Sequence, residues 1–574
     1  MALSFRRAVW LSLAAGLLLA LPSLSLGLLL DDDFHRALVS GVAYPHRPLD
    51  LYAFVPGDAA ALRPFIERGP FPWFTPPELK LVFFRPLSSA LIYLDVWLFG
   101  GRAWPAHLHS IAWGLALIGA AALLYRRLLP ERAAPFALLL FALDPSHATP
   151  VDWLANRNAL VAAVPVVLGL FAHLAWRTRG WAPGAWLSAA GYAVGLCGAE
   201  AALAGLVYVP AYEAFGASES RRERLFALAP LAGVVAVWAV VYRGLGYGSS
   251  GSGIYLDPTH DPAGFLLAAG PRACALVGAM TVGLPSDFWL DPRARPVLVA
   301  VGLAGVALVA WLLRARVKTL DPGLRRTVAW LTAGSLLGLL PSLAIFPSDR
   351  LLLLPSLGGA AVVAVLLQSL WADRTRWSAR LPLAVLGAAH LLFPLSGWLL
   401  GPGTLSKMAR SVERAGLEPG LTPPQASRRL IAVAAPDFAQ TLYLPLVRMR
   451  EKLPLPESWN VLSFAPRDHR LTRLSDRSFE VEVVDGALFE SVYEQMVRGG
   501  QNRLDPGDRV RLWHAWVTVI DSDGYHVRRL RLDLDEGAEA WQFVQWKDGR
   551  VVPLDPPEVG SSVRLARQKG AFDL

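Results

Sequence analysis

Long apolar segments, separated by short loops that contain arginine, fill the chain up to about residue 400. Hydrophobic residues make up 54% of the 574 positions and charged residues only 18%. A helix needs about 20 apolar residues to cross the hydrocarbon core of a bilayer, and most of these segments approach that length. Residues 1–405 therefore predict an α-helical polytopic membrane protein.

The arginines of the loops predict its orientation. Arg6 and Arg7 precede the apolar run 8–30, which places the amino terminus in the cytoplasm; a cleaved signal peptide is the competing interpretation. Later basic residues mark further cytoplasmic loops: Arg126, Arg127, Arg132, Arg177, Arg179, Arg221, Arg222, Arg224, Arg314, Arg316, Lys318, Arg325, Arg326, Arg374, Arg376 and Arg380. About eleven spanning helices result.

Two further apolar stretches, 84–100 and 265–284, would each move every later basic loop to the other side if either spanned alone. We therefore expect both to be juxtamembrane or re-entrant helices on the outer side. The first contains Arg85, Asp95 and several aromatic residues, a composition that suits a helix in the membrane interface.

Residues 406–574 predict a separate soluble domain of mixed α and β structure. The stretches SFEVEVVDG (478–486), RVRLWHAWVTVID (509–521) and VRRLRLDLD (527–535) alternate apolar and polar residues, which is typical of half-buried strands. Residues 430–450 indicate a strand followed by a helix. The membrane domain would then comprise residues 1–405, with an outer loop 1 at about 31–103, and the α+β domain would follow it outside the cytoplasm.

The five most conspicuous aromatic residues of that domain are Trp459, Trp513, Trp516, Trp541 and Trp546. They could stack on sugars, but in a small domain tryptophans more often belong to the core because they bury a large apolar area. Acceptor recognition and a stabilising cap over the outer loops are both open as roles for the domain.

Three consecutive aspartates, Asp31, Asp32 and Asp33, follow the first apolar segment. Carboxylates are costly at a membrane interface, so this run favours a functional role over a charged stop. Other outer segments add Arg85, His147, Asp152, Arg157, Glu200, Asp349 and Arg350. Each has a structural explanation as a snorkelling side chain, a cap or half of an ion pair, but their collection at one membrane face favours a pocket.

Carboxylates and arginines at the outer leaflet suit glycosyl transfer from a polyisoprenyl phosphate. The leaving phosphate needs guanidinium charge, and an acceptor hydroxyl needs a carboxylate that takes its proton. A direct displacement of this kind would occur in one inverting step.

The order of several motifs resembles membrane glycosyltransferases of the GT-C fold. After the acidic run come FFRPLSSALIYLDVWLFG (83–100), LFALDPSHATPVDWLANRNAL (140–160), CGAEAALAGLVYVPAY (197–212) and PSDRLLLLPSLGG (347–359). They look most like the transmembrane O-mannosyltransferases, with more distant similarity to the enzymes that transfer aminoarabinose to lipid A. The resemblance covers roughly residues 1–400.

The resemblance implies roles for the outer residues. Asp32, or its neighbour Asp31 or Asp33, would be the catalytic base. The donor phosphate would be bound by Arg85, Arg157 and Arg350, and the pocket would also contain Asp152, Glu200, His147 and Asp349. Ala199 stands where the family often has a Lys before the Glu, and Leu351 stands where an aromatic residue usually follows the Arg. These departures put the donor contacts in doubt and leave a diverged or inactive enzyme open.

The expected partners are a polyisoprenyl-phosphate-linked sugar donor, a protein, lipid or glycan acceptor, and membrane lipids. Nucleic acid is not expected, because the arginines lie in the loops that set orientation. The family likeness favours a bacterial inner membrane with a periplasmic C-terminal domain. A lipid-linked sugar transporter is one alternative, although it would more often show internal repeats. A noncatalytic scaffold or receptor is the other.

No cofactor is clearly required. Mg²⁺ or Mn²⁺ on the aspartate run is an open alternative, since these ions prefer oxygen ligands, but adjacent aspartates are not an ordered coordination set. Cys197 and Cys274 both lie in apolar stretches, so neither a disulfide framework nor a cysteine metal site is expected.

Overall fold

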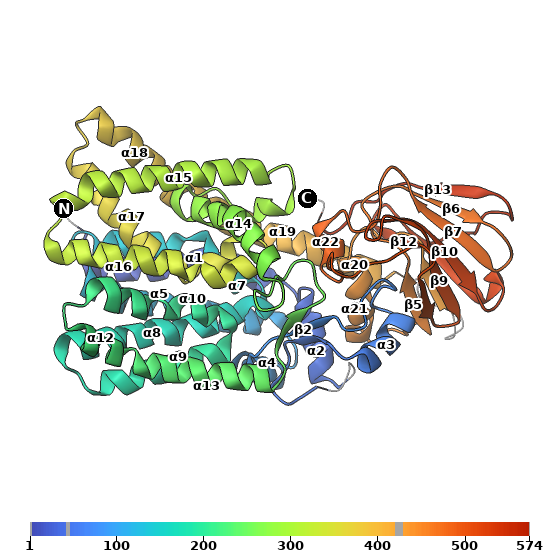
Figure 1. Ribbon diagram of the computed structural model, residues 1–574, viewed down its shortest axis with the longest axis horizontal. Coiled ribbons are helices and arrows are strands. Elements are labelled where there is room, and N and C mark those ends of the chain that lie inside the picture. The colour runs from blue at the N-terminus through green and yellow to red at the C-terminus, as the bar shows by residue number, and fades with distance from the viewer. Residues whose placement is uncertain (1–2, 42–45, 419–428, 573–574) are drawn as a thin grey trace.

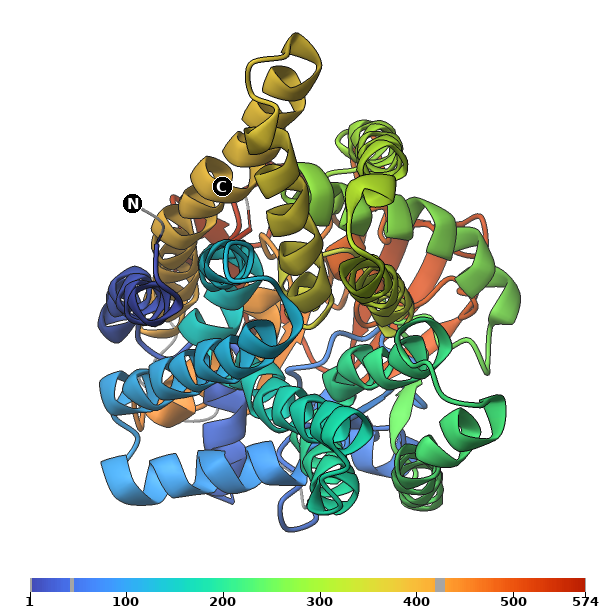
Figure 2. The same ribbon diagram turned by 90° about the vertical axis from the view of Figure 1, so that its left-hand side faces the viewer.

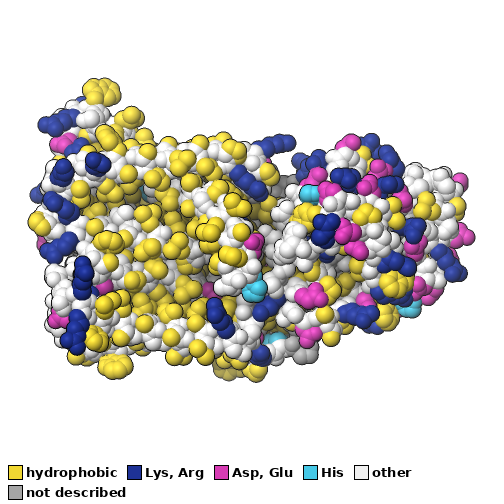
Figure 3. All heavy atoms as spheres, viewed as in Figure 1, with side chains coloured by type: hydrophobic (Ala, Val, Ile, Leu, Met, Phe, Trp, Pro, Cys, Tyr) yellow, Lys and Arg dark blue, Asp and Glu magenta, His cyan; other side chains and the backbone are white. Residues whose placement is uncertain are grey.

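The computed structural model describes residues 3–41, 46–418 and 429–572. A helical bundle and a β-rich domain lie end to end along its longest axis (Figure 1). Apolar side chains cover the bundle as a broad belt, whereas charged side chains of both signs are distributed over the β-rich domain (Figure 3). The chain is therefore a multi-pass α-helical membrane protein with a polar C-terminal domain, as the sequence predicts.

Nine helical segments of the described residues are long and apolar enough to cross a membrane. Their main helices are α1 (Phe5–Ala20), α5 (Ala103–Leu128), α8 (Asn158–Arg179), α12 (Arg221–Ala227) with α13 (Ala229–Gly244), α14 (Pro262–Val282), α15 (Arg295–Arg316), α16 (Pro322–Gly338), α17 (Pro355–Ala372), and α18 (Trp377–Gly387) with α19 (Phe393–Gly416). The last two join through the π-helix η10 (Ala388–Leu392), so the final span continues directly toward the β-rich domain.

Three segments counted among the eleven predicted spans are short or broken. They are α6 (Ala134–Leu143), α9 (Pro183–Gly198), and residues 200–216, which form η4 (Glu200–Ala202), α10 (Leu203–Leu206), α11 (Tyr208–Ala211) and the π-helix η5 (Tyr212–Gly216). Pro210 removes a backbone donor in the broken segment, which explains its failure to form one regular helix. The nine long segments are thus fewer than the predicted number, and they include α14, which was expected to stay outside.

The segments before and after α14 are both bonded to the same connection of the bundle, although the length of the helix would allow it to span. Before the helix, Leu256 donates its N–H to the carbonyl oxygen of Ala344 (2.7 Å). After it, the N–H of Ser286 donates to Oδ1 of Asp349 (2.8 Å). Ala344 and Asp349 belong to the same short connection between α16 and α17. The placement agrees with the expected re-entrant helix.

The predicted helix 84–100 is α4 (Pro86–Phe99), which lies across the bundle rather than along it (Figure 2). It ends at Gly100, whose φ of 59° terminates the helix in the left-handed conformation that glycine adopts freely. It contacts both α2 (Asp31–Val39) and α9. This arrangement agrees with the expected interfacial helix.

The remainder of the first loop forms β1 (Ala53–Pro56), α3 (Ala59–Glu67) and β2 (Lys80–Val82). β1 and β2 join β3 (Gly248–Ser250) in a three-stranded antiparallel sheet, which ties this loop to the segment before α14. At the start of α2, Leu30 has a φ of 45°, and the resulting sharp turn makes Asp31 the first helical residue.

The β-rich domain contains two sheets. One is antiparallel with the order β13-β6-β7-β10-β9-β8, and the other has the order β12-β11-β4-β5 with β4 parallel to both neighbours. The elements are β4 (Arg429–Ala432), β5 (Ser458–Val461), β6 (His469–Arg473), β7 (Ser478–Val483), β8 (Arg509–Leu512), β9 (Ala515–Ser522), β10 (Val527–Leu534), β11 (Trp541–Lys547), β12 (Arg550–Pro553), β13 (Ser562–Leu565), α20 (Ala439–Leu442), α21 (Leu444–Arg450) and α22 (Val492–Gln495). The strands expected in the three alternating stretches are present.

The tryptophans of this domain are packed rather than presented to solvent. Trp459, Trp541 and Trp546 are buried in its core. Trp513 is covered by the guanidinium of Arg68, 3.7 Å from the ring centroid, and Trp516 is covered by two arginines of β8. These contacts support the structural interpretation of the five side chains.

The first loop contributes to the core of the β-rich domain. Trp73 donates its indole N–H to the carbonyl oxygen of Leu462 (2.8 Å), and the Phe74 ring lies 5.3 Å and 5.1 Å from the rings of Phe464 and Phe489. Because these buried side chains come from sequence positions almost 400 residues apart, the loop and the domain form one packed unit.

Candidate functional site

A cavity of about 1820 Å³ lies where the bundle meets the β-rich domain. Its walls are formed by α2, the first loop, the connection before α14, η6 (Ser286–Leu290), η8 (Leu340–Ala344), η9 (Asp349–Leu352), α19 and the helices α20–α22. Most of the lining is aromatic or aliphatic, with a small number of ionisable groups. A largely apolar cavity with a few convergent polar groups is the usual form of a ligand site.

One side of the cavity extends into the apolar belt between α13 and η8. Trp238, Ala239 and Tyr242 of α13 form one wall, and Leu340 and Pro341 form the other. No residue of α13 is buried within the protein, and Figure 3 shows the apolar face hollowed in this region. A hydrocarbon chain in the bilayer therefore has a continuous apolar route to the cavity.

Asp31 is the member of the aspartate run that lines the cavity. Burial raises the pKa of its carboxyl group, and a hydrogen bond donated by the Tyr443 hydroxyl, together with the charges of Arg350 and Arg85, partly offsets that effect. Tyr443 belongs to the β-rich domain. Sequence reasoning missed it, because nothing local links it to a residue 412 positions earlier.

Asp32 and Asp33 have structural contacts instead. Asp32 accepts hydrogen bonds from the backbone N–H groups of Leu29 (2.9 Å) and Ala155 (2.7 Å), so it joins the first and second loops. Asp33 pairs with Arg450 at the end of α21 (2.9 Å). Neither residue lines the cavity, so the base role expected above all for Asp32 is not supported by its position.

Arg85 and Glu200 reach the cavity as an ion pair. The Arg85 Nε atom lies 2.9 Å from Oε2 of Glu200, whose other oxygen accepts the N–H of Phe84 (2.8 Å). The guanidinium also lies over the rings of Tyr52 and Phe83, at 4.8 Å from each centroid. Burial lowers the pKa of Arg85, but the charge and hydrogen bond of Glu200, together with the nearby Tyr52 and Tyr255, outweigh this effect and the net pKa is raised.

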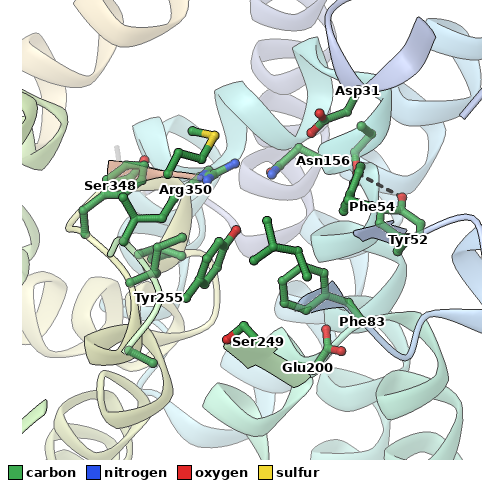
Figure 4. Close-up of a pocket in the computed structure, with 18 of the residues that line it drawn as sticks. Asp31, Tyr52, Phe54, Phe83, Asn156, Glu200, Ser249, Tyr255, Ser348 and Arg350 are labelled. Atoms are coloured by element: carbon green, nitrogen blue, oxygen red, sulfur yellow. Dashed lines mark hydrogen bonds between the residues drawn. The ribbon is translucent and has the colours of Figure 1, made fainter. Parts of the chain in front are cut away.

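Arg350 also lines the cavity, and its guanidinium lies 5.8 Å from the ring centroid of Trp153. Among the described residues no carboxylate oxygen lies within 4 Å of it, in contrast to Arg85. Figure 4 shows Arg350, Asn156 and Asp31 directed toward the same space. Asn156 was not singled out as a site residue; its Oδ1 is buried and has no hydrogen-bond partner in the described structure.

Arg157 is placed away from the cavity, contrary to its expected phosphate role. It is buried, forms an ion pair with Asp95 and donates to the carbonyl oxygen of Ala106 (3.1 Å). A guanidinium that is already paired and enclosed by α4, α5 and α8 is not available to an incoming phosphate. Its contacts identify it as a link between these helices.

His147 and Asp152, two further expected pocket residues, are also buried outside the cavity lining. They lie on the short elements η2 (Pro145–His147) and α7 (Ala148–Asp152). Burial lowers the pKa of His147 to about 3 and raises that of Asp152 to about 7. Both oxygens of Asp152 lack a hydrogen-bond partner among the described residues.

Asp349 positions the segment that carries Arg350. Its Oδ1 accepts hydrogen bonds from both the N–H and the hydroxyl of Ser286, and Asp287 accepts the hydroxyl of Ser348 (2.6 Å). Burial, followed by the adjacent charge of Asp287, raises the pKa of Asp349 to about 7. Its side chain points away from the main cavity toward a small neighbouring one.

Within residues 3–41, 46–418 and 429–572, no group of three or more His, Cys, Asp or Glu side chains is arranged to hold a metal ion. The aspartate run is not such a group either. Its three carboxylates leave the start of one helix in different directions and contact Tyr443, backbone N–H groups and Arg450, respectively.

No protein-family model matches the sequence, and no curated protein matches it. Among solved structures, the chain is similar to the archaeal oligosaccharyltransferase AglB from Archaeoglobus fulgidus in complex with an inhibitory peptide and a dolichol-phosphate, with a TM-score of 0.41 and 12% identity over 78% of this chain and 64% of that one. It is also similar to ArnT from Cupriavidus metallidurans bound to undecaprenyl phosphate, with a TM-score of 0.41 and 17% identity over 78% of this chain and 85% of that one. The chain thus spans less than two thirds of the oligosaccharyltransferase.

Proposed function

We propose that the protein is a glycosyltransferase that moves a sugar from a polyisoprenyl-phosphate donor to a hydroxyl acceptor at the outer face of the membrane. One observation carries the proposal. A carboxylate, Asp31, and a guanidinium without a carboxylate partner, Arg350, face a common cavity that continues into the apolar belt (Figure 4). A lipid-linked phosphate ester needs this combination of an apolar channel and fixed positive charge.

The donor would enter between α13 and η8. Its polyisoprenyl chain would occupy the groove lined by Trp238, Tyr242 and Leu340. The phosphate would then reach Arg350. Because Glu200 already neutralises much of the charge of Arg85, Arg350 would be the principal phosphate contact and Arg85 a secondary one.

The reaction would be a direct displacement. An acceptor hydroxyl attacks the anomeric carbon, its proton passes to the carboxylate of Asp31, and the bond between that carbon and the phosphate oxygen breaks. The bonding pair leaves with the lipid phosphate, whose negative charge is balanced by Arg350. Burial favours the proton-bound form of Asp31, which strengthens it as a base, while the Tyr443 hydrogen bond keeps it ionised over a wider pH range.

The basic side chains of the bundle indicate which side of the membrane the cavity faces. Basic side chains gather at the end of the bundle opposite the β-rich domain (Figure 3), and such residues are enriched on cytoplasmic sides. The cavity and the β-rich domain would then face the outside, which in a bacterial inner membrane is the periplasm.

A panel of synthetic polyisoprenyl-phosphate sugars tests the function. Wild-type protein in nanodiscs should release or transfer the sugar of at least one donor, whereas the Asp31→Asn variant should lose about 100-fold or more of that turnover. Asp33→Asn is the matched control, because it alters the same acidic run without touching the cavity. Equal turnover by wild type and Asp31→Asn would refute the assigned base. Consumption of no donor by folded wild type would favour a transporter or scaffold.

A further inference from the structure

The two sides of the cavity differ in charge. The bundle and its loops contribute every Asp, Glu, Arg and His among the described lining residues, including Asp31, Arg85, Glu200 and Arg350. The β-rich domain contributes only uncharged side chains, among them Leu446 and others from α20–α22. This second surface, together with Phe572 near the end of the chain, is called the domain wall.

The neutrality of the domain wall is local. Elsewhere the surface of the same domain is dense in charge, with ion pairs such as Arg467–Glu490 (2.9 Å), Arg470–Glu482 (2.5 Å) and Arg511–Asp535 (2.5 Å). Uncharged residues on the domain wall indicate a ligand group that carries no charge itself.

Three aromatic rings of the domain wall lie nearly parallel. The Phe438 ring lies 5.1 Å from that of Phe572 with an interplanar angle of 10°, and 5.8 Å from that of Tyr493 with an angle of 21°. Tyr493 and Phe572 are themselves 4.5 Å apart. All three line the cavity, and Tyr493 and Phe572 are only partly buried. Stacked rings cover part of one another, so the C–H face of a sugar ring can pack only on the uncovered parts of Tyr493 and Phe572, which are called the aromatic face here.

This aromatic group lies beside the proposed base. The Tyr443 ring is 6.4 Å from that of Phe438, and its hydroxyl donates to Asp31. One tyrosine side chain therefore separates the aromatic face from the carboxylate.

We propose that the domain wall is the acceptor subsite and that the acceptor is a neutral carbohydrate. The inference rests on the proposed transferase function and specifies its second substrate. Sugar hydroxyls would bond to the tyrosine hydroxyls and to Asp31, while the apolar face of the sugar packs on Tyr493 and Phe572.

Other acceptor classes fit the domain wall less well. A phosphorylated or acidic acceptor would be desolvated without a cation on this side, which is costly. An acyl chain would have to leave the bilayer, whereas the domain wall is built by the polar domain beyond the apolar belt.

Saturation-transfer NMR on the full-length protein in nanodiscs tests this assignment. The probes are the methyl glycosides of glucose, galactose and mannose, the neutral disaccharide maltose, glucuronic acid as a charged analogue, and the peptide Ala-Ser-Ala. We expect saturation transfer to at least one neutral sugar, little transfer to glucuronic acid or the peptide, and loss of at least about 80% of the sugar signal in Tyr493→Ala. The matched control is Trp516→Ala, which removes a partly buried aromatic side chain of the same domain outside the cavity.

If Tyr493→Ala does not fold, as judged by thermal unfolding, Phe572→Ala replaces it in the same comparison. Binding of glucuronic acid or peptide in preference to every neutral sugar, or no binding of any neutral sugar, would overturn the proposal. So would equal sugar binding by wild type and both cavity variants. Donor hydrolysis in the same preparations separates the two proposals: sugar binding without hydrolysis contradicts only the transferase, whereas hydrolysis without sugar binding contradicts only the acceptor assignment.

Discussion

The bundle wall and the domain wall enclose one cavity but have opposite chemistry. The bundle wall places Asp31, Arg85, Glu200 and Arg350 around the space, while the domain wall presents Leu, Met, Phe and Tyr side chains. Fixed charge is useful where charge develops during bond cleavage, and an uncharged surface is useful where a neutral molecule is selected. The difference therefore suggests a division of labour, with the reaction controlled by the bundle and acceptor choice controlled by the β-rich domain.

Among substitutions in the bundle wall, the loss of Arg350 should reduce donor turnover most. Arg350→Gln should reduce donor turnover about 100- to 1000-fold, the usual effect of losing a charge-stabilising donor at a developing anion. Arg157→Gln is the informative contrast, because Arg157 is also an arginine but is already paired with Asp95 outside the cavity. It should lower thermal stability and yield rather than the turnover of the folded protein. Turnover rates under donor saturation, with unfolding curves for both variants, would show whether the two arginines differ in this way.

The hydrogen bond from Tyr443 to Asp31, which joins the two walls, should set the pH dependence of turnover. Tyr443→Phe removes the hydrogen bond that lowers the pKa of Asp31, so the pKa should rise further above its already raised value. Asp31 would then become protonated at higher pH, and the acidic limb of the pH–rate profile should move upward by about one to two pH units. Turnover at high pH should change little. An unchanged acidic limb would show that Tyr443 does not act on the base.

A charge placed on the domain wall should affect the acceptor more than the donor. Met496 lines the cavity and permits a nearly isosteric pair of variants. Met496→Glu should raise the acceptor KM by about tenfold, equivalent to about 1.4 kcal/mol, while Met496→Gln should raise it less. Donor hydrolysis should be similar in both. Steady-state kinetics with each substrate varied would check this. Equal acceptor KM values for the two variants would show that the lack of charge on the domain wall does not affect acceptor binding.

Asp152 should have the smallest effect on turnover, because it lies outside both walls. Asp152→Asn should keep donor turnover within about twofold of wild type. In the wild type the folded-state pKa is about 7 and the ordinary value is 3.8, so its contribution to stability should be lost as pH rises through this interval. The stability of Asp152→Asn should not fall over the same pH interval. Unfolding curves of both proteins at pH 5 and pH 8 would reveal this difference in stability. A large fall in the turnover of Asp152→Asn would show that Asp152 belongs to the functional site.

The sequence predicts much of the fold because hydrophobic length and arginine placement are local signals. The re-entrant α14 was inferred from the parity of basic loops, and the strands of the β-rich domain from alternating residues such as those of β7. The short and broken segments are harder to assign, since α6 is strongly apolar but only 10 residues long, and residues 200–216 form several short helical pieces in place of one helix.

The candidate site is less accessible to sequence reasoning. Asp31, Arg85, Glu200 and Arg350 reach the cavity as expected for a pocket, but Asp32 and Asp33 do not. Successive helical residues point about 100° apart, so which of three adjacent aspartates faces the cavity depends on a rotation that the sequence does not encode.

Other residues depend on long-range packing. The pairing of Arg157 with Asp95 and the contact of Tyr443 with Asp31 join distant segments, and neither pair has a local signature. The same limit applies to the domain wall. Its aromatic residues look like ordinary core side chains until the fold stacks three of them and places one, Phe438, next to the Tyr443 ring that contacts Asp31.

The most direct measurement is a cryo-EM structure of the protein with undecaprenyl phosphate in a lipid nanodisc. The account predicts phosphate density within hydrogen-bond distance of Arg350, facing Asp31, with the isoprenoid chain between α13 and η8. Phosphate density bound elsewhere, or a chain that lies on the domain wall, would contradict the assignment of the two walls and with it the proposed function.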